Sequence, residues 1–437
     1  MLKTILHQLL NQRRMNGWIF FELLLVSLFL WMVIDPICVL KSVQSMPHGY
    51  ESEGRYVVRL QTLDATYAAF NPESEDDSLR VNYYEHIARL LRDLPEVDSY
   101  AVSVQLNFPG SGNWSGGTLY GDTLAVKGDK SVHGQWYAFV DFEGSDPFKT
   151  YGFRDAATGA YLKKPADTRN KLFLSENYAQ ALCGTAQATG KFVYMGYQSK
   201  YEVAGVFANY KHFEETEYYP LYIQFEPEIK ASPYMVWRYP FILKLKEGVD
   251  ATAFEQRFAK EVAPLLSMGN LRFASLKSFD SYVEDNKEMS GTNNLFRLKY
   301  ALTGFAVLCI FLGMLGTFWI RSNARRQEIG VMRSMGASRQ TITLQFLLEA
   351  GSLVTLAFLC ALVFILIYGH LEGFTPVPSA GNHPLRDPDF WANNFTGHFL
   401  VVSMVAYIIL LVTSLLGTYI PVRRAANVLP ADALRDE

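Results

Sequence analysis

Four long runs of apolar residues interrupt an otherwise polar sequence. The first, Trp18–Leu40, has an uncharged centre, and the other three, Tyr300–Ile320, Gly351–Gly369 and Phe399–Ile420, carry no charge at all. About 20 helical residues, each rising 1.5 Å, cross the ~30 Å hydrocarbon layer of a bilayer. The pattern therefore predicts four transmembrane helices, at residues 18–40, 299–320, 351–369 and 399–420.

The first of these runs also fits a second interpretation, a cleaved signal peptide. Lys3, Arg13 and Arg14 precede it, as basic residues precede the apolar part of a signal peptide. No convincing cleavage site made of small residues follows, so we expect an uncleaved anchor. Apolar residues at helical spacing in 1–17 predict a cytoplasmic amphipathic helix that leads into this span.

The short segments between the runs differ in their number of Lys and Arg residues. There are three in residues 1–17, five in 321–350 and three in 421–437, but only one in 370–398. Basic residues collect on the cytoplasmic side of a membrane. We therefore expect a multi-pass protein of the cell inner membrane with both termini and the 321–350 loop in the cytoplasm. Residues 41–298 and the outer loop 370–398 would lie on the periplasmic side.

The block 41–298 has the pattern of a folded domain. Both of its ends predict a strand, a helix and a strand, about residues 50–106 and 241–280, and two such units can pair into a single porter-like layer. The strand-rich residues between them, about 107–240, predict an inserted lobe. The predicted fold class is an α-helical membrane protein with four transmembrane helices and a large α+β extracytoplasmic domain inserted between helices 1 and 2.

One helix of this domain is specified in detail by its sequence. Asp250 is a suitable N-cap, and four large apolar residues follow at helical spacing. We expect all four on the buried face of a single helix: Phe254, Phe258, Val262 and Leu265.

Composition and motifs exclude several classes of function. The net charge of −3 argues against nucleic-acid binding, and the GxSxG, SxxK and HExxH motifs of common hydrolases are missing from the sequence. His370, His383 and His398 fall in or beside the 370–398 loop without the tight spacing of metal ligands, so we expect solvated side chains. The sequence predicts a chain that is not an enzyme and that holds no catalytic, cofactor or metal site.

The most specific segment is Arg325–Arg339, between the second and third spans. It predicts a short helix over about 327–334 that ends near Gly336, with Ser338 or a neighbour starting the next helix. Glu328, Val331, Met332 and Met335 would form a small mixed surface. A short helix that lies crosswise between two spans could bind a soluble motor protein and pass its movement to the spans. An ordinary basic loop would also satisfy the rule that basic residues lie on the cytoplasmic side.

This segment resembles the signature of the MacB/FtsX-like ABC permease family, an Arg-x-Glu-Ile-Gly…Gly-Ala-Ser run after the second span. The tail Pro421–Arg435 and the order of one span, a large external domain and three spans are similar to the four-span members of that family. The resemblance implies a coupling helix that docks on an ATPase subunit. The residues on the matching loop are Arg325, Arg326, Glu328, Ile329, Gly330, Met332, Arg333, Gly336, Ala337 and Ser338.

The resemblance also implies the composition of the complex. The chain lacks a Walker A motif, so ATP and Mg²⁺ would be bound by a separate ATPase subunit. A second permease copy, identical or paralogous, would complete the membrane part, and a periplasmic adaptor or outer-membrane channel is a further expected partner. Small residues in the second span would let helices approach closely within the lipid bilayer: Gly304, Gly313 and Gly316.

Two functions within this family fit the sequence. The large external domain favours export, or extraction of lipoprotein or another substrate, over a mechanotransmitting role in regulating an envelope cell-wall hydrolase. An anchored sensor and a membrane-tethered enzyme are the alternatives outside the family.

Overall fold

The computed structural model describes residues 13–113, 115–128, 130–196, 199–232, 234–379 and 385–427. It divides into two compact units. The membrane unit comprises residues up to Ser42, then Thr292–Val377 and Asp387 onwards, and the α+β domain comprises Val43–Gly291 with Pro378–Arg386. The predicted helix at 1–17 and the last ten residues of the tail lie largely outside the described residues.

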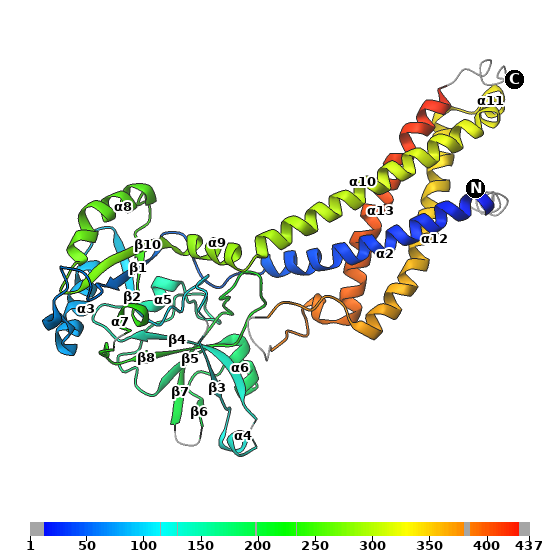
Figure 1. Ribbon diagram of the computed structural model, residues 1–437. Coiled ribbons are helices and arrows are strands. Elements are labelled where there is room, and N and C mark those ends of the chain that lie inside the picture. Colours follow the sequence, from blue (N-terminus) through cyan, green and yellow to red (C-terminus); the bar gives the residue numbers. More distant parts are fainter. Residues whose placement is uncertain are drawn as a thin grey trace. The chain divides into compact units, whose positions relative to one another are not determined.

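The membrane unit contains four helices that are long and apolar enough to cross a bilayer (Figure 1). The predicted spans are all present, and each helix extends beyond its uncharged centre by several residues. The four helices are α2 (Arg13–Gln44), α10 (Thr292–Ala324), α12 (Arg339–Glu372) and α13 (Phe395–Ala426), and between them lie the short helices α11 (Arg326–Ser334) and η4 (Trp391–Asn393).

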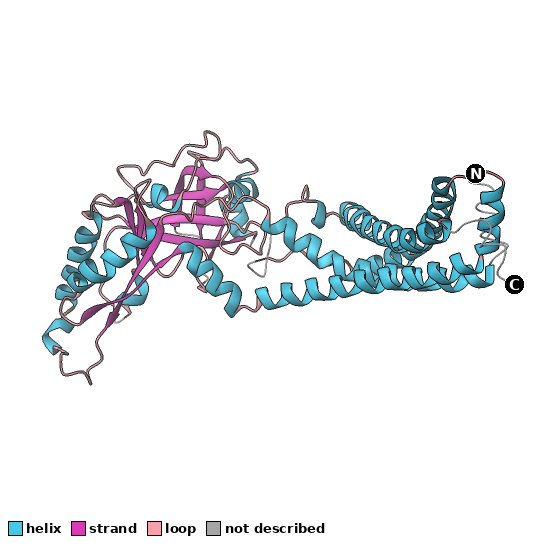
Figure 2. Ribbon diagram, turned by 90° about the horizontal axis from the view of Figure 1, so that it is seen from above, coloured by secondary structure: helices cyan, strands magenta, loops and turns pink. Residues whose placement is uncertain are grey.

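Helix α13 packs against both α10 and α12, and α2 contacts α13 as well. One apolar cluster runs through all four helices and includes Trp31 of α2, Met314 of α10, Phe358 of α12 and Leu410 of α13. Every described element of this unit is helical, whereas the strands belong to the α+β domain (Figure 2). This is the expected division, because only helices and closed barrels satisfy backbone polar groups in lipid.

The α+β domain is built on one mixed sheet. Its strands follow the order β10-β1-β9-β2-β4-β8-β5-β7-β6, with β3 paired to β4. The strands are β1 (Arg55–Thr62), β2 (Val97–Val104), β3 (Gly116–Leu119), β4 (Val132–Val140), β5 (Lys171–Ser175), β6 (Phe192–Met195), β7 (Ser199–Phe207), β8 (Leu221–Glu226), β9 (Phe241–Leu245) and β10 (Leu271–Ser278). Its helices are η1 (Pro72–Glu75), α3 (Asp77–Arg92), α4 (Thr123–Lys127), α5 (Pro147–Tyr151), α6 (Glu176–Cys183), α7 (Met235–Arg238), α8 (Ala251–Arg257), η2 (Phe258–Val262), η3 (Ala263–Leu266) and α9 (Phe279–Met289).

The two strand–helix–strand units at the ends of this domain do form one layer, as the sequence predicts. Strand β1 lies between β10 and β9, antiparallel to both, and β2 pairs with the other edge of β9. The order β10-β1-β9-β2, with one helical connection in each unit, is that of a split βαβ layer. Strand β4 of the inserted lobe joins this layer through two residue pairs, Ser103↔Phe139 and Val104↔Ala138.

Both faces of this layer are buried. Side chains of a strand alternate between faces, so Tyr56, Val58 and Leu60 of β1 pack toward the helices α3 and α8. Val57, between them, belongs instead to a core rich in aromatic rings that fills the inserted lobe. The lobe is therefore fastened to the layer by packing as well as by backbone pairing.

The helix capped by Asp250 departs from the prediction. The Asp250 carboxylate accepts a hydrogen bond from the Ala253 amide, 2.7 Å, as expected. After Arg257 the winding loosens to a π-type turn and then tightens to a 3₁₀ turn. This change of winding buries Leu266 and leaves Leu265 exposed, so the prediction of Leu265 as a core residue is wrong.

Candidate functional site

Helix α11 begins and ends where the sequence predicts. Helix α10 ends at Ala324, and α11 runs from Arg326 to Ser334. Gly336 follows with φ of +92°, a conformation that glycine adopts without strain. Its amide donates to the Arg333 carbonyl and the Ala337 amide to the Met332 carbonyl, which is the Schellman pattern of hydrogen bonds. Ser338 then caps α12 by accepting from the Thr341 amide at 3.1 Å.

One side of α11 packs into the membrane unit. Ile329 is buried and belongs to the same apolar cluster as Ile342 and Phe346 of α12. Met332 and Ala337 pack against that cluster while partly buried, and Gly330 is buried as well. These residues anchor α11 and leave other positions free to contact a partner.

Arg325, at the corner between α10 and α11, is buried and bound on three sides. Its guanidinium donates to both carboxylate oxygens of Glu349 in α12, at 3.2 and 2.9 Å, and to both of Glu328 in α11, at 2.6 and 2.8 Å. The guanidinium carbon also lies 4.6 Å from the centre of the Phe346 ring. A planar guanidinium with five donors is suited to holding two carboxylates at once.

This ion-pair cluster, Arg325, Glu328 and Glu349, ties three elements together. Glu349 is only 1% exposed, so its charge has little solvation by water and is stabilised by the Arg325 guanidinium. Breaking a buried pair by removing one partner typically costs about 3–5 kcal/mol. Arg325 therefore acts by fixing the angle at which α11 leaves α10, and its side chain is not on the exposed surface.

The opposite side of α11 is exposed and partly apolar. Met335 is 83% exposed and Val331 47%, so two apolar side chains lie on the surface of this short segment. Glu328, Val331 and Met335 are spaced i, i+3 and i+7, so they share one side of the helix. We call this set the α11 face. It matches the mixed surface predicted from the sequence, except that Met332 packs inward.

Two basic residues link α11 and its neighbours to the end of α13. Arg333 donates to the Ala426 carbonyl at 3.4 Å, and the Arg424 guanidinium lies 5.0 Å from the centre of the Trp319 ring in α10. The view in Figure 1 places α11 at the same end of the bundle as the end of α13. The side chain of Arg326 lies outside the described part of the structure.

The three glycines of the second span have different surroundings. A methyl group at Gly313 would meet the Glu22 carboxylate of α2 at 2.6 Å, so this glycine does allow a close approach. Gly304 and Gly316 face open space among the described residues, so any packing role for them requires another chain. Gly417 of α13 lies against the backbone of α10, where a methyl group would be 2.9 Å from the Phe311 carbonyl oxygen.

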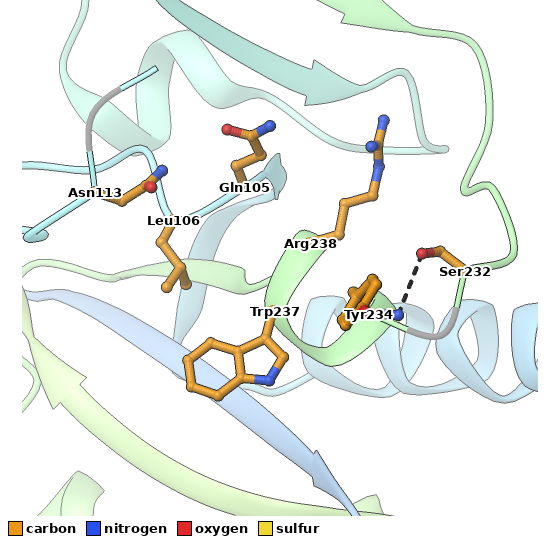
Figure 3. Close-up of a pocket in the computed structure, with 7 residues that line it drawn as sticks. All are labelled: Gln105, Leu106, Asn113, Ser232, Tyr234, Trp237 and Arg238. Carbon is orange, nitrogen blue, oxygen red and sulfur yellow. Dashed lines mark hydrogen bonds between the residues drawn. The ribbon is translucent and has the colours of Figure 1, made fainter.

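The α+β domain has a shallow pocket of about 420 Å³ beside α7. Tyr234 and Trp237 are both largely exposed there, and Gln105 has φ of +63°, which is uncommon outside glycine. Figure 3 shows the Gln105 and Leu106 side chains next to the helix that carries Trp237 and Arg238. Arg238 is already paired with Glu226 at 2.7 Å, so the pocket offers aromatic faces and amide groups and little free charge.

Two buried bases of this domain carry no signal in the sequence. The Lys211 ammonium donates to the Val43 carbonyl and, at 3.3 Å, to the Glu214 carbonyl, and burial lowers its pKa to about 8. His212 accepts from the Tyr137 hydroxyl on Nδ1, 2.6 Å, and donates from Nε2 to the Asn113 carbonyl, 2.8 Å. Burial lowers the pKa of His212 to about 4, so the ring is neutral near pH 7.

No cluster of three or more metal-ligating residues occurs among the described residues. Of the three histidines expected to be solvated, His370 is exposed, whereas His383 lies outside the described residues. The expectation is wrong for His398, which is 2% exposed and hydrogen-bonded to Asp35.

Comparisons with known proteins agree with the resemblance seen in the sequence. Residues 300–429 match the FtsX-like permease C-terminal family. The macrolide export ATP-binding/permease protein MacB of Escherichia coli K12 is 26% identical over 212 residues, which are 46% of this chain and 28% of that protein. The MacB protein of Escherichia coli O157:H7 matches over the same extent with the same identity. The chain thus aligns with under a third of the length of these relatives.

Solved structures with similarity to part of this chain include a periplasmic region and an extracellular domain. The periplasmic region of MacB from Actinobacillus actinomycetemcomitans is 12% identical and covers 56% of this chain and 97% of its own, with a TM-score of 0.32. The extracellular domain of the ABC-type transporter YknZ from Gram-positive bacteria is also 12% identical, covering 50% and 100%, with a TM-score of 0.28. The resemblance to the MacB/FtsX-like permeases is confirmed, and the family match at residues 300–429 includes α11.

Proposed function

We propose that this chain is the permease subunit of an ABC transporter, and that the α11 face is the surface on which a separate ATPase subunit docks. The observation that supports this most directly is an exposed apolar pair, Val331 and Met335, on a short helix whose other side is locked into the membrane unit. An apolar pair with a charged neighbour is the kind of surface that a protein partner covers.

The ion-pair cluster supports a mechanical role for this surface. A force applied to α11 passes through Arg325 to Glu349 in α12, and through the chain itself to α10. Because the contacts are short and buried, α11 moves with these helices and does not swing freely. Movement of the ATPase would in this way be passed to the spans and on to the periplasmic α+β domain.

The other parts of the proposal follow from the family. ATP and Mg²⁺ would be bound by the ATPase subunit, and this chain would be a non-catalytic subunit with α11 and both termini in the cytoplasm. A second permease copy would complete the membrane part in the inner membrane. We propose export, or extraction of a lipoprotein or other substrate, as the process driven, with a periplasmic adaptor or outer-membrane channel as a further partner.

The test is whether ATPase activity purifies with the chain through the α11 face. The full chain with an affinity tag is purified in mild detergent from the cells that make it naturally, and ATP hydrolysis by the eluate is measured. The wild type is expected to bring ATPase activity with it. The double variant Val331→Asp with Met335→Asp should lose most of that activity, because two charges would have to be buried against the partner.

A matched control places the same change elsewhere. Leu124 and Met289 are likewise exposed apolar side chains, 74% and 77%, but they belong to the α+β domain. Leu124→Asp with Met289→Asp should retain the activity. Equal ATPase activity in both double variants would show that the α11 face is not the docking surface.

A further inference from the structure

The membrane unit contains a buried contact between two ionisable side chains that the proposed function does not use. Asp35 of α2 and His398 of α13 are 4% and 2% exposed, and Oδ1 of Asp35 lies 2.5 Å from Nε2 of His398. Both residues belong to helices that can span a membrane, where ionisable groups are costly and are usually functional.

The remaining polar atoms of this pair all have partners. Oδ2 of Asp35 accepts from the backbone amide of Thr375 at 3.1 Å and from its hydroxyl at 2.7 Å. Nδ1 of His398 lies 3.1 Å from the Ala392 carbonyl oxygen. The rings of Phe374 and Trp391 pack on the imidazole, with centres 5.0 and 5.5 Å away. The pair therefore joins α2, the segment after α12 and the start of α13.

This arrangement needs one more proton than a neutral imidazole supplies, because each ring nitrogen of His398 faces an oxygen atom. A carbonyl oxygen can only accept, so Nδ1 of His398 must carry hydrogen to bond Ala392. In a neutral ring Nε2 would then present its lone pair to the Asp35 carboxylate at 2.5 Å, and two acceptors repel each other at that distance. The contact is favourable only when a proton lies between Nε2 and Oδ1.

We propose that Asp35 and His398 form a buried proton-binding site, which holds one proton beyond those of a neutral imidazole and a carboxylate. The bound proton lies between Nε2 of the His398 ring and Oδ1 of the Asp35 carboxylate, and it holds α2 against the start of α13. A metal ion does not fit, because a metal–ligand bond is about 2.0–2.2 Å on each side and the two atoms are closer than such a bridge allows. The site does not depend on the ATP-coupled function proposed above.

The charged and titratable groups nearest to the pair belong to α10, to α2 itself and to α12. Lys299 of α10 lies within electrostatic range of Asp35, and Cys38 follows one turn later in α2. His370 of α12 is exposed and stacks on Phe395, which stacks on Phe374, so two rings separate it from His398. The acidic side chains that lie close in sequence to Thr375 and Ala392 are exposed: Glu372, Asp387 and Asp389.

The test measures how stable the contact between α2, the segment after α12 and the start of α13 is as the pH changes. We call this contact the junction. Hydrogen exchange of residues 373–377 and 391–398 is followed in the full-length chain in detergent at several pH values between about 5.5 and 9, and is expressed as protection relative to the free peptide rate. When the proton leaves, the lone pairs of Nε2 and Oδ1 face each other and repel, which weakens the junction. Wild-type protection should then fall with rising pH, by up to about tenfold per pH unit over the interval in which the proton leaves.

Two substitutions remove the need for the proton. In Asp35→Asn the new amide donates to Nε2 of a neutral His398, so protection should become independent of pH while the packing is kept. His398→Gln, whose amide donates to Asp35, should likewise abolish the slope, and it serves if the first variant fails to fold.

Two further variants are controls. Thr375→Val removes one hydrogen bond to Asp35 but keeps the proton, so protection should fall equally at every pH with the slope unchanged. His370→Asn changes a histidine outside the pair and should preserve the wild-type profile. A flat wild-type profile, or the wild-type slope persisting in both Asp35→Asn and His398→Gln, would overturn the proposal.

Discussion

Arg325 is the residue on which the geometry of α11 depends most. Its partner Glu349 is buried in α12, so removing the guanidinium takes a positive charge away from a carboxylate with little solvation. We expect Arg325→Met to destabilise the membrane unit by about 3–5 kcal/mol. The measurement is the midpoint of thermal unfolding of the full chain in detergent.

A double variant separates the charge effect from simple loss of packing. Arg325→Met combined with Glu349→Met removes both buried charges and should recover much of the lost stability, since well-packed apolar groups often replace a buried ion pair at little cost. Arg325→Lys, which keeps the charge but loses the fork of donors, should fall between wild type and Arg325→Met. If the double variant is as unstable as the single one, the destabilisation does not arise from the buried charge of Glu349.

His212 should make the α+β domain sensitive to acid. Its pKa is about 4 in the folded chain and about 6.5 when unfolded, so between these values the unfolded state binds more protons. Stability therefore falls as the pH drops from about 6.5 to 4, by on the order of 3 kcal/mol in total. Hydrogen exchange of β4 in the full chain, followed against pH, measures this loss.

The matched variant for this prediction is His212→Gln. Its amide nitrogen can replace the Nε2 donor to Asn113, but it does not titrate. Its protection should change less with pH between 6.5 and 4 than that of the wild type. The same pH dependence in both proteins would mean that another group causes the acid sensitivity.

At the scale of elements, the contact of α10 with α13 depends on Gly417. A methyl group there would lie 2.9 Å from a backbone oxygen of α10, which cannot move aside as a flexible side chain can. We expect Gly417→Ala to cost about 1–3 kcal/mol by forcing the helices apart. Gly304→Ala and Gly316→Ala project into open space and should cost nothing in the single chain. Thermal unfolding of the three variants in detergent compares them, and equal midpoints would contradict this packing.

Elements with local signals could be predicted from the sequence, and those without could not. Helix α11 is bounded by a glycine of positive φ and a serine cap, both readable within a few residues. The winding change that exposes Leu265 is different, because it results from packing of Leu266 against residues far away in the sequence. The ion pair of Arg325 with Glu349 could not be predicted either, because the two residues are 24 positions apart in the sequence.

At the scale of the whole molecule, the separation of polar and apolar blocks was enough to predict the two units. The layer formed by β1, β2, β9 and β10 followed from two similar strand patterns at the ends of one domain. The order of strands in the inserted lobe could not be predicted, because parallel pairs such as β4 with β8 join residues about 85 positions apart with no local signal. The burial of His398 was missed for the same reason, because its partner is 363 residues away.

Cross-linking from the α11 face shows whether a separate ATPase docks there. A photoreactive amino acid is placed at position 335, or at position 124 of the α+β domain as the control, and cells that make the full chain are irradiated. Mass spectrometry then identifies the cross-linked partner. Position 335 is expected to capture a protein with an ATP-binding P-loop, and position 124 is expected not to. Capture from position 335 of envelope proteins alone, with no ATPase among them, would contradict it.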